Sequence, residues 1–166
     1  MRSILLVLIC VLLCGTALPQ SQPSAAVLRQ LTQRSKFIFG GTVNSVERLA
    51  SPGIPTVRIT FTVDRAVRGV RAGQSFTIRE WAGLWSAGPR YRPGQHVFLF
   101  LYPTSKLGLT SPVSGNLGRF DIDNDDVVLG REHLDALPNR QTSSTTRRSR
   151  LSSRDFARAI RRAAED

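Results

Sequence analysis

Residues 96–102 read HVFLFLY, and this apolar run constrains the fold more than any other stretch of the chain. The run is too short to cross a membrane as a helix, which needs about 20 residues. Pro93-Gly94 precedes it and Pro103 follows it, so turn signals bound it on both sides. A short, bounded apolar segment of this kind predicts a central β-strand that is buried on both faces.

Three other segments are β-rich. Residues 57–63 alternate apolar and polar side chains, as a half-buried antiparallel strand does, and the phase slips near Arg65, which indicates a bulge or the strand end. The alternation restarts over residues 76–78, after a turn bracketed by two glycines. Residues 37–46 are interrupted by Gly40-Gly41, which indicates a bulge or a tight bend.

Helices are expected at both ends of the folded region. Residues 25–35 carry apolar side chains three and four positions apart, which predicts a short helix. Residues 151–166 predict an amphipathic helix, with a capping box made by Ser152 and Asp155 and a hydrophobic staple made by Leu151 and Phe156. Residues 138–150 lack apolar periodicity and are expected to be a linker.

These elements predict a mainly β fold, because five or six short strands follow one another without intervening helices. We expect a small antiparallel OB-like barrel over residues 25–137, with a short N-terminal helix and the C-terminal amphipathic helix. The bend expected in the first strand favours a barrel over a sandwich.

The N-terminal segment has the layout of a secretory signal. Arg2 precedes an apolar stretch over residues 4–13, and small residues follow at positions 15–17. We therefore expect cleavage after Ala17 and a secreted or periplasmic protein, with an uncleaved N-terminal anchor as the alternative. Residues 18–24 are rich in Pro, Ser and Gln and are expected to be a disordered lead-in.

Both cysteines lie within residues 1–17, so the mature chain would have no disulfide, thiolate metal site or cysteine nucleophile. The net charge is +11, from 23 Lys and Arg against 12 Asp and Glu. This charge either reflects arginine-rich coding and solubility or indicates an anionic partner, such as nucleic acid, a lipid headgroup or an acidic polysaccharide. Export argues against nucleic acid.

Residues 79–92 are the best candidate binding segment, because aromatic faces stack on bases or sugars and arginines hold anionic groups. The alternative is that both tryptophans cap the open ends of the barrel and the arginines are merely solvated. The candidate binding residues are Arg79, Trp81, Trp85, Arg90, Tyr91 and Arg92.

Candidates for catalysis and metal binding are weak. Asp121, Asp123, Asp125 and Glu132 have the spacing of calcium-loop ligands, but a hairpin between residues 120–122 and 127–129 explains them better. His96 and His133 are isolated, and no Gly-x-Ser-x-Gly pattern occurs. We expect neither an enzyme nor a bound cofactor.

The order of four motifs over residues 27–122 resembles a group of uncharacterised secreted bacterial proteins. The first motif is a helix followed by Ser35 and by a Gly-x-Val pattern that begins at Gly41. The second is a strand rich in Thr and Val that ends in Arg68-Gly69. The third is the apolar run after Gly94, and the fourth is the Gly-basic-Phe pattern at residues 118–120. The pattern is also similar to the netrin-like module of the tissue inhibitors of metalloproteases. That resemblance implies a five-stranded OB-type barrel with helices packed against it.

Two departures limit what the resemblance implies. Lys36 stands where the family often has an acidic residue, and the N-terminal cysteine that chelates the protease zinc is missing from the mature chain. The inhibitory mechanism therefore does not carry over. We expect a non-enzymatic module that binds a protein or an envelope component, with an OB-type binder of single-stranded nucleic acid or another polyanion as the alternative.

Overall fold

The computed structural model describes residues 25–50, 53–88, 90–130, 133 and 150–165. The predictions for the signal segment, for the lead-in at 18–24 and for the linker at 138–149 lie outside these residues. No helix among the described residues combines the length and the apolar character that a membrane span requires.

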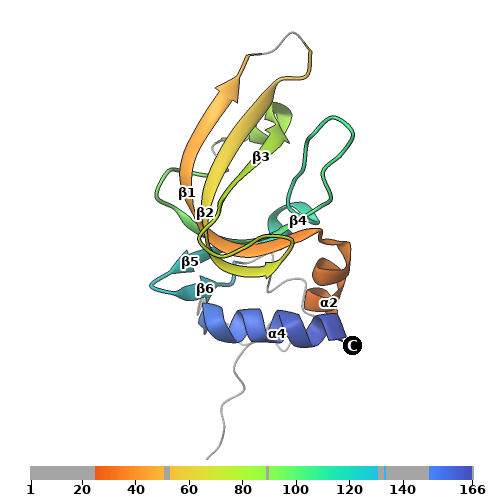
Figure 1. The fold of residues 1–166 in the computed structure, drawn as a ribbon, viewed down its shortest axis with the longest axis vertical. Coiled ribbons are helices and arrows are strands. Elements are labelled where there is room, and N and C mark those ends of the chain that lie inside the picture. The colour runs from red at the N-terminus through yellow and green to blue at the C-terminus, as the bar shows by residue number, and fades with distance from the viewer. Residues whose placement is uncertain (1–24, 51–52, 89, 131–132, 134–149, 166) are drawn as a thin grey trace, which may run out of the picture.

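A single antiparallel sheet forms the body of the protein (Figure 1). Its seven strands have the order β3-β2-β1-β4-β5-β6-β7. Two helices and two short 3-10 turns complete the described elements. In chain order these are α2 (Ala25–Arg34), β1 (Phe37–Leu49), β2 (Thr56–Arg68), β3 (Ser75–Trp81), η2 (Ala82–Trp85), β4 (His96–Leu101), η3 (Gly115–Gly118), β5 (Arg119–Asp123), β6 (Asp126–Val128), β7 (Arg150–Ser152) and α4 (Ser153–Glu165).

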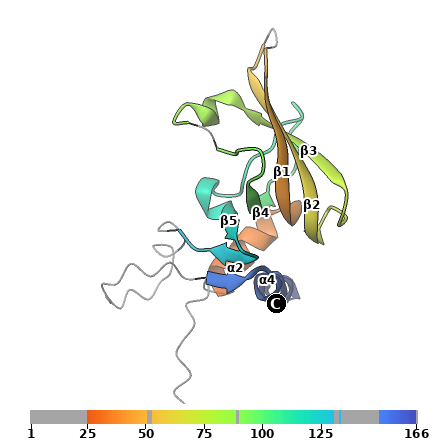
Figure 2. The same ribbon diagram turned by 90° about the vertical axis from the view of Figure 1, so that its left-hand side faces the viewer.

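The prediction of a mainly β fold with two terminal helices is confirmed. The sheet has one more strand than the upper expected number and is not closed into a barrel. It stays open because β4 pairs with β5, and β6 and β7 continue away from β3 toward the helices (Figures 1 and 2). Residue 150, expected in the linker, and residues 151–152, expected in the helix, form β7 instead.

Strand β1 bends at the glycine pair, as predicted. Its pairing with β2 shifts register between Gly40 and Gly41, and its first half also pairs with β4. A Cβ atom on Gly41 would lie 2.6 Å from the carbonyl oxygen of Thr62, so only glycine fits at this bend. The predicted phase slip near Arg65 is a bulge, because Gly40 pairs with Arg65 and Gly41 with Val63.

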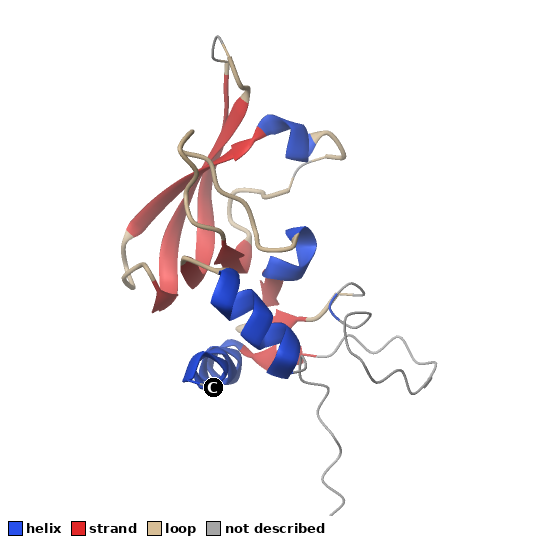
Figure 3. Ribbon diagram, turned by 90° about the vertical axis from the view of Figure 1, so that its right-hand side faces the viewer, coloured by secondary structure: helices blue, strands red, loops and turns tan. Residues whose placement is uncertain are grey.

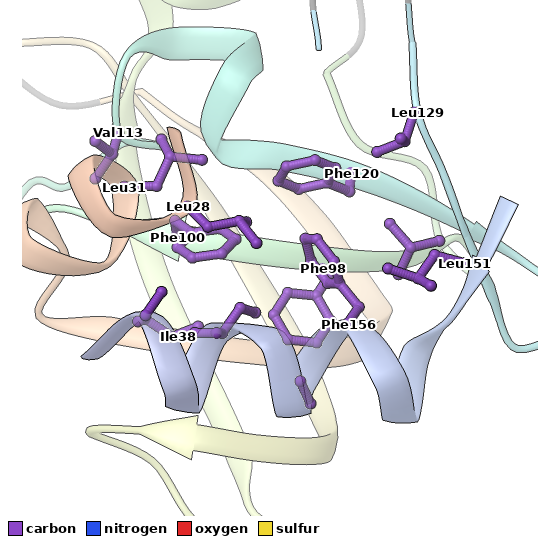
Figure 4. Packing of buried hydrophobic residues seen from close by; sticks show 14 residues of the cluster. Leu28, Leu31, Ile38, Phe98, Phe100, Val113, Phe120, Leu129, Leu151 and Phe156 are labelled. Atoms are coloured by element: carbon purple, nitrogen blue, oxygen red, sulfur yellow. The ribbon is translucent and has the colours of Figure 1, made fainter. Parts of the chain in front are cut away.

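Two hydrophobic cores lie on opposite faces of β1 and β4. Val97, Leu99 and Leu101 point into the core of the curled half of the sheet, together with residues of β2 and β3. Phe98 and Phe100 point to the other face and pack against Phe156 of α4 and the side chains of α2 (Figure 4). The prediction that the apolar run is a strand buried on both faces is therefore confirmed.

The capping box predicted for the C-terminal helix is present, although α4 begins at Ser153. The Ser152 hydroxyl accepts the backbone N–H of Asp155 at 3.2 Å and donates to the Asp155 carboxylate at 3.1 Å. Leu151 and Phe156 both lie in the core between the helices and the sheet. The helix that follows the expected linker is thus part of the same folded unit; it runs across one end of the sheet in Figure 1 and is seen end-on in Figure 3.

Candidate functional site

The six predicted binding residues do not form one surface, because β3 alternates between buried and exposed positions. Ile78 and Glu80 point into the core, whereas Arg79 and Trp81 point outward. The 3-10 turn η2 then returns Trp85 to the interior, and Tyr91 is also buried. Of the six candidate binding residues, Trp85 and Tyr91 are therefore buried, whereas Arg79, Trp81 and Arg92 are exposed.

Glu80 is the centre of a buried polar cluster (the Glu80 cluster: Glu80, Trp85, Arg90 and Tyr91). The Glu80 side chain is fully buried. Its carboxylate accepts the indole N–H of Trp85 at 3.0 Å and the hydroxyl of Tyr91 at 3.3 Å, and Arg90 Nε lies 3.2 Å from Oε2. The guanidinium of Arg119 lies 5.0 Å from the centre of the Tyr91 ring. These contacts fasten the segment after β3 onto the sheet.

Burial raises the pKa values of the two acidic groups of this cluster. Loss of hydration raises the pKa of the Glu80 carboxyl, and the Arg90 charge and the two hydrogen bonds oppose that shift without cancelling it. Burial and the neighbouring Glu80 charge also raise the pKa of the Tyr91 hydroxyl. The cluster has the contacts of a structural anchor, and nothing in its geometry exposes a reactive atom to a ligand.

Arg79 and Trp81 remain at the surface. The Arg79 Nη2 atom donates to the carbonyl oxygen of Leu107 at 3.0 Å, and the Thr110 N–H donates to the Arg79 carbonyl oxygen at 2.9 Å. These two bonds hold the loop between β4 and η3 against β3, where Figure 1 shows it rising beside the strand. The Trp81 ring lies directly against Gly83, where an added Cβ atom would overlap the ring and displace it.

Two hollows share Arg79. The first, which we call the tip hollow, has a volume of about 230 Å³ and is lined by Leu49, Ile54, Thr56, Arg79, Leu107 and Leu109. The second, which we call the β3-edge groove, has a volume of about 280 Å³ and lies between β3 and residues 104–110. No carboxylate lines either of them among the described residues.

The tip hollow is bordered by large exposed apolar side chains. Ile54 is 46% exposed, Leu107 61% and Trp81 50%. Trp81 is not part of the lining, but it pairs across the strands with Thr56, which is. Arg92, the remaining predicted residue, is exposed in the turn before β4, where its backbone N–H donates to Gln95.

The aspartates considered for calcium are distributed around a hairpin. β5 and β6 pair with Asp123 opposite Asp126, and the two residues between them, Asn124 and Asp125, both have positive φ. Each of the three aspartates considered interacts with a different arginine: Asp121 with Arg119, Asp123 with Arg150, and Asp125 with Arg65. The hairpin prediction is confirmed; Glu132 lies outside the described residues.

A third hollow, of about 510 Å³, lies beside this hairpin. Asp64 accepts the hydroxyl of Thr42 at 2.9 Å, and His96 Nδ1 lies 3.3 Å from the same hydroxyl. On the hairpin side, the Ser153 hydroxyl donates to Asp125 and holds the pKa of that carboxyl below its ordinary value. The short polar side chains here are paired mainly with one another, so this hollow is the weaker candidate for ligand binding.

His133, the other isolated histidine, is a core residue. Its ring stacks on Phe120 with 4.0 Å between ring centres, and its Nδ1 atom accepts the backbone N–H of Gly130 at 2.9 Å. These contacts give it a structural role.

Sequence reasoning missed Glu80, Ile54 and Leu107. Glu80 has a recognisable signal, because an acid at an inward position of an alternating strand must find buried partners. Ile54 and Leu107 lie in loops, where no periodicity marks them. Comparisons with protein-family models, with curated proteins and with solved structures found no match to the chain.

Proposed function

We propose that the chain is a secreted, non-enzymatic binding module that holds an acidic segment of a partner protein at the tip hollow. The observation that carries this proposal is that the exposed Ile54 and Leu107 line the tip hollow together with Arg79, while the exposed Trp81 lies opposite Thr56 of the same lining. Exposed apolar side chains that cluster and are rimmed by polar groups mark interaction surfaces. Trp and Arg are also the residue types that contribute most to binding energy at protein interfaces.

The charge of the surface supports an acidic partner. Arg79 lies opposite Arg58 on the paired strands, and within the described parts of the chain Glu47 forms its ion pair, of 3.4 Å, with Arg58 and not with Arg79. The Arg79 guanidinium interacts with the carbonyl oxygen of Leu107, which carries no formal charge. A partner carboxylate placed beside Arg79 would therefore be attracted by a cation that forms no ion pair with any residue that the structure describes.

Selection from a displayed random-peptide library tests this proposal. We expect the selected peptides to combine Asp or Glu with large apolar residues. Serine at Ile54, Trp81 and Leu107 together should weaken their binding at least roughly tenfold, because truncated anchor residues commonly cost more than about 1.4 kcal/mol. The control is Asp64→Asn with His96→Gln, which alters the third hollow. Equal binding by the triple variant and this control would refute the proposal.

The alternative is an OB-type binder of single-stranded nucleic acid or another polyanion, which the exposed Trp81 beside Arg79 favours. Stacking proteins normally offer several exposed aromatic faces, whereas Trp85 and Tyr91 are buried. Binding of an oligonucleotide or heparin that falls steeply with salt and requires Trp81 would support this alternative.

A further inference from the structure

The outer edge of β3 has backbone groups available for another strand. Consecutive residues of a strand direct their backbone hydrogen-bonding groups to opposite sides. The Arg79 carbonyl oxygen binds Thr110 on the outer side, whereas Ala82 N–H binds the Pro55 carbonyl oxygen on the β2 side. By this alternation Thr77 directs its N–H and carbonyl oxygen outward, where no described residue forms a backbone hydrogen bond with them.

The β3-edge groove runs along this same edge. Its lining includes the four consecutive residues 76–79. Because successive side chains of a strand point to opposite faces, a hollow that touches four in a row must follow the edge of the strand. Phe37 and Phe76, whose ring centres are 5.1 Å apart, supply apolar surface, and Thr104 lies on the opposite wall.

The charge of the groove selects the kind of strand that fits. Arg58 and Arg79 line it, and no described carboxylate does. The third hollow, beside the β5–β6 hairpin, differs because three aspartates line it. Extended segments that add to an exposed sheet edge gain affinity from backbone hydrogen bonds and specificity from pockets for alternate side chains.

We propose that an extended acidic segment of a partner protein adds to the edge of β3 beside Thr77, with alternate side chains in the β3-edge groove. Its carboxylates face Arg58 and Arg79, and its apolar side chains contact Phe37 and Phe76. This inference rests on the proposed function, because it specifies how the same partner continues from the tip hollow past Arg79.

The test uses a fluorescein-labelled peptide of about ten residues, a common strand length, in which glutamate and threonine alternate with valine. A matched peptide with lysine in place of glutamate is the charge control. Fluorescence anisotropy measures binding to the wild type, to Thr77→Pro and to Thr77→Val. Proline removes the outward N–H and is tolerated on the free side of an edge strand, whereas valine keeps the N–H and the side-chain shape.

We expect the acidic peptide to bind at least roughly tenfold more tightly than the basic one. We also expect Thr77→Pro to weaken binding by a similar factor, and Thr77→Val to change it by less than about threefold. In the wild type, the acidic peptide should slow hydrogen exchange at the Thr77 amide, and this measurement decides the matter if the proline variant does not fold. No binding, equal binding by the proline and valine variants, or unchanged exchange at Thr77 would overturn strand addition.

These outcomes separate the two proposals. If library peptides require Ile54, Trp81 and Leu107 but bind the proline variant normally, the tip hollow is a binding site and strand addition is wrong. If those peptides bind the triple serine variant as tightly as the wild type, the proposed function is wrong, whatever the effect of the substitutions at Thr77.

Discussion

Replacing Glu80 separates two roles of a buried carboxylate, which are accepting hydrogen bonds and carrying charge. In Glu80→Leu, the indole N–H of Trp85 and the hydroxyl of Tyr91 both lose their acceptor inside the protein. Each buried donor without an acceptor costs about 1–3 kcal/mol, so the free energy of unfolding should fall by about 3 kcal/mol. For a chain of this size that loss corresponds to a decrease of roughly 10 °C in Tm.

Glu80→Gln should destabilise the protein much less than Glu80→Leu, because the amide oxygen can still accept the Trp85 N–H and the amide NH₂ can donate to the Tyr91 oxygen. The difference in stability between this variant and the wild type also depends on pH, and the direction of that dependence follows from the raised pKa of Glu80. A carboxyl with a raised pKa in the folded state contributes stability that is fully present below its unfolded pKa. That contribution is lost as pH rises through the folded pKa. The glutamine variant should therefore gain stability relative to the wild type between about pH 4 and pH 7.

Urea unfolding followed by tryptophan fluorescence at both pH values measures these differences. Glu47→Gln is the control, because Glu47 forms an exposed ion pair with Arg58 that contributes less than about 1 kcal/mol. Two results would refute the reasoning. The first is a leucine variant within about 0.5 kcal/mol of the wild type, since two buried donors cannot lose their acceptor at so small a cost. The second is a glutamine variant that loses stability relative to the wild type as pH rises, which would mean that the Arg90 charge outweighs burial.

Three further substitutions test the architecture by thermal unfolding. Gly41→Ala should cost about 1–3 kcal/mol, because the added methyl group meets backbone at the bend of β1; an unchanged Tm would contradict that crowding. Ser152→Ala should cost about 1 kcal/mol through loss of the α4 cap, whereas Ser45→Ala should be nearly neutral, because the half-buried Ser45 caps no helix and its hydroxyl donates to the exposed Glu47 at 3.4 Å. Phe156→Ala should cost about 3–5 kcal/mol and shift the unfolding of the whole domain, and a sheet that melted as before would show that α4 is not part of its core.

The parts of the fold that the sequence predicts are those with a local signal. The apolar run at residues 96–102 becomes β4 because hydrophobic side chains on both faces of a strand require cover on both sides. The capping box at Ser152 and the turn at Asn124-Asp125 use local hydrogen bonds and local backbone conformation, so a few residues specify them. Strand β7 has three residues, which is too short for any period to appear.

The candidate site was harder to predict because it depends on contacts between segments distant in sequence. Leu107 belongs to the site because Arg79 binds its carbonyl oxygen, 28 residues away along the chain. The composition of residues 79–92 could not show which aromatic side chains would be buried. That outcome depends on the strand phase, which places Glu80 inward, and on η2, which brings Trp85 back to it.

The buried acid and the exposed surface are connected through the segment that follows β3. Trp85 fixes the end of η2 to Glu80, and η2 includes Gly83, against which the Trp81 ring lies. The anchored turn therefore occupies one side of the Trp81 ring and limits its positions, and a side chain restricted before binding loses less entropy when a partner covers it. The segment that looked like one aromatic and arginine surface is thus divided between two roles. Its inward residues anchor the turn, and its outward residues Arg79 and Trp81 are held at the surface where a partner could reach them.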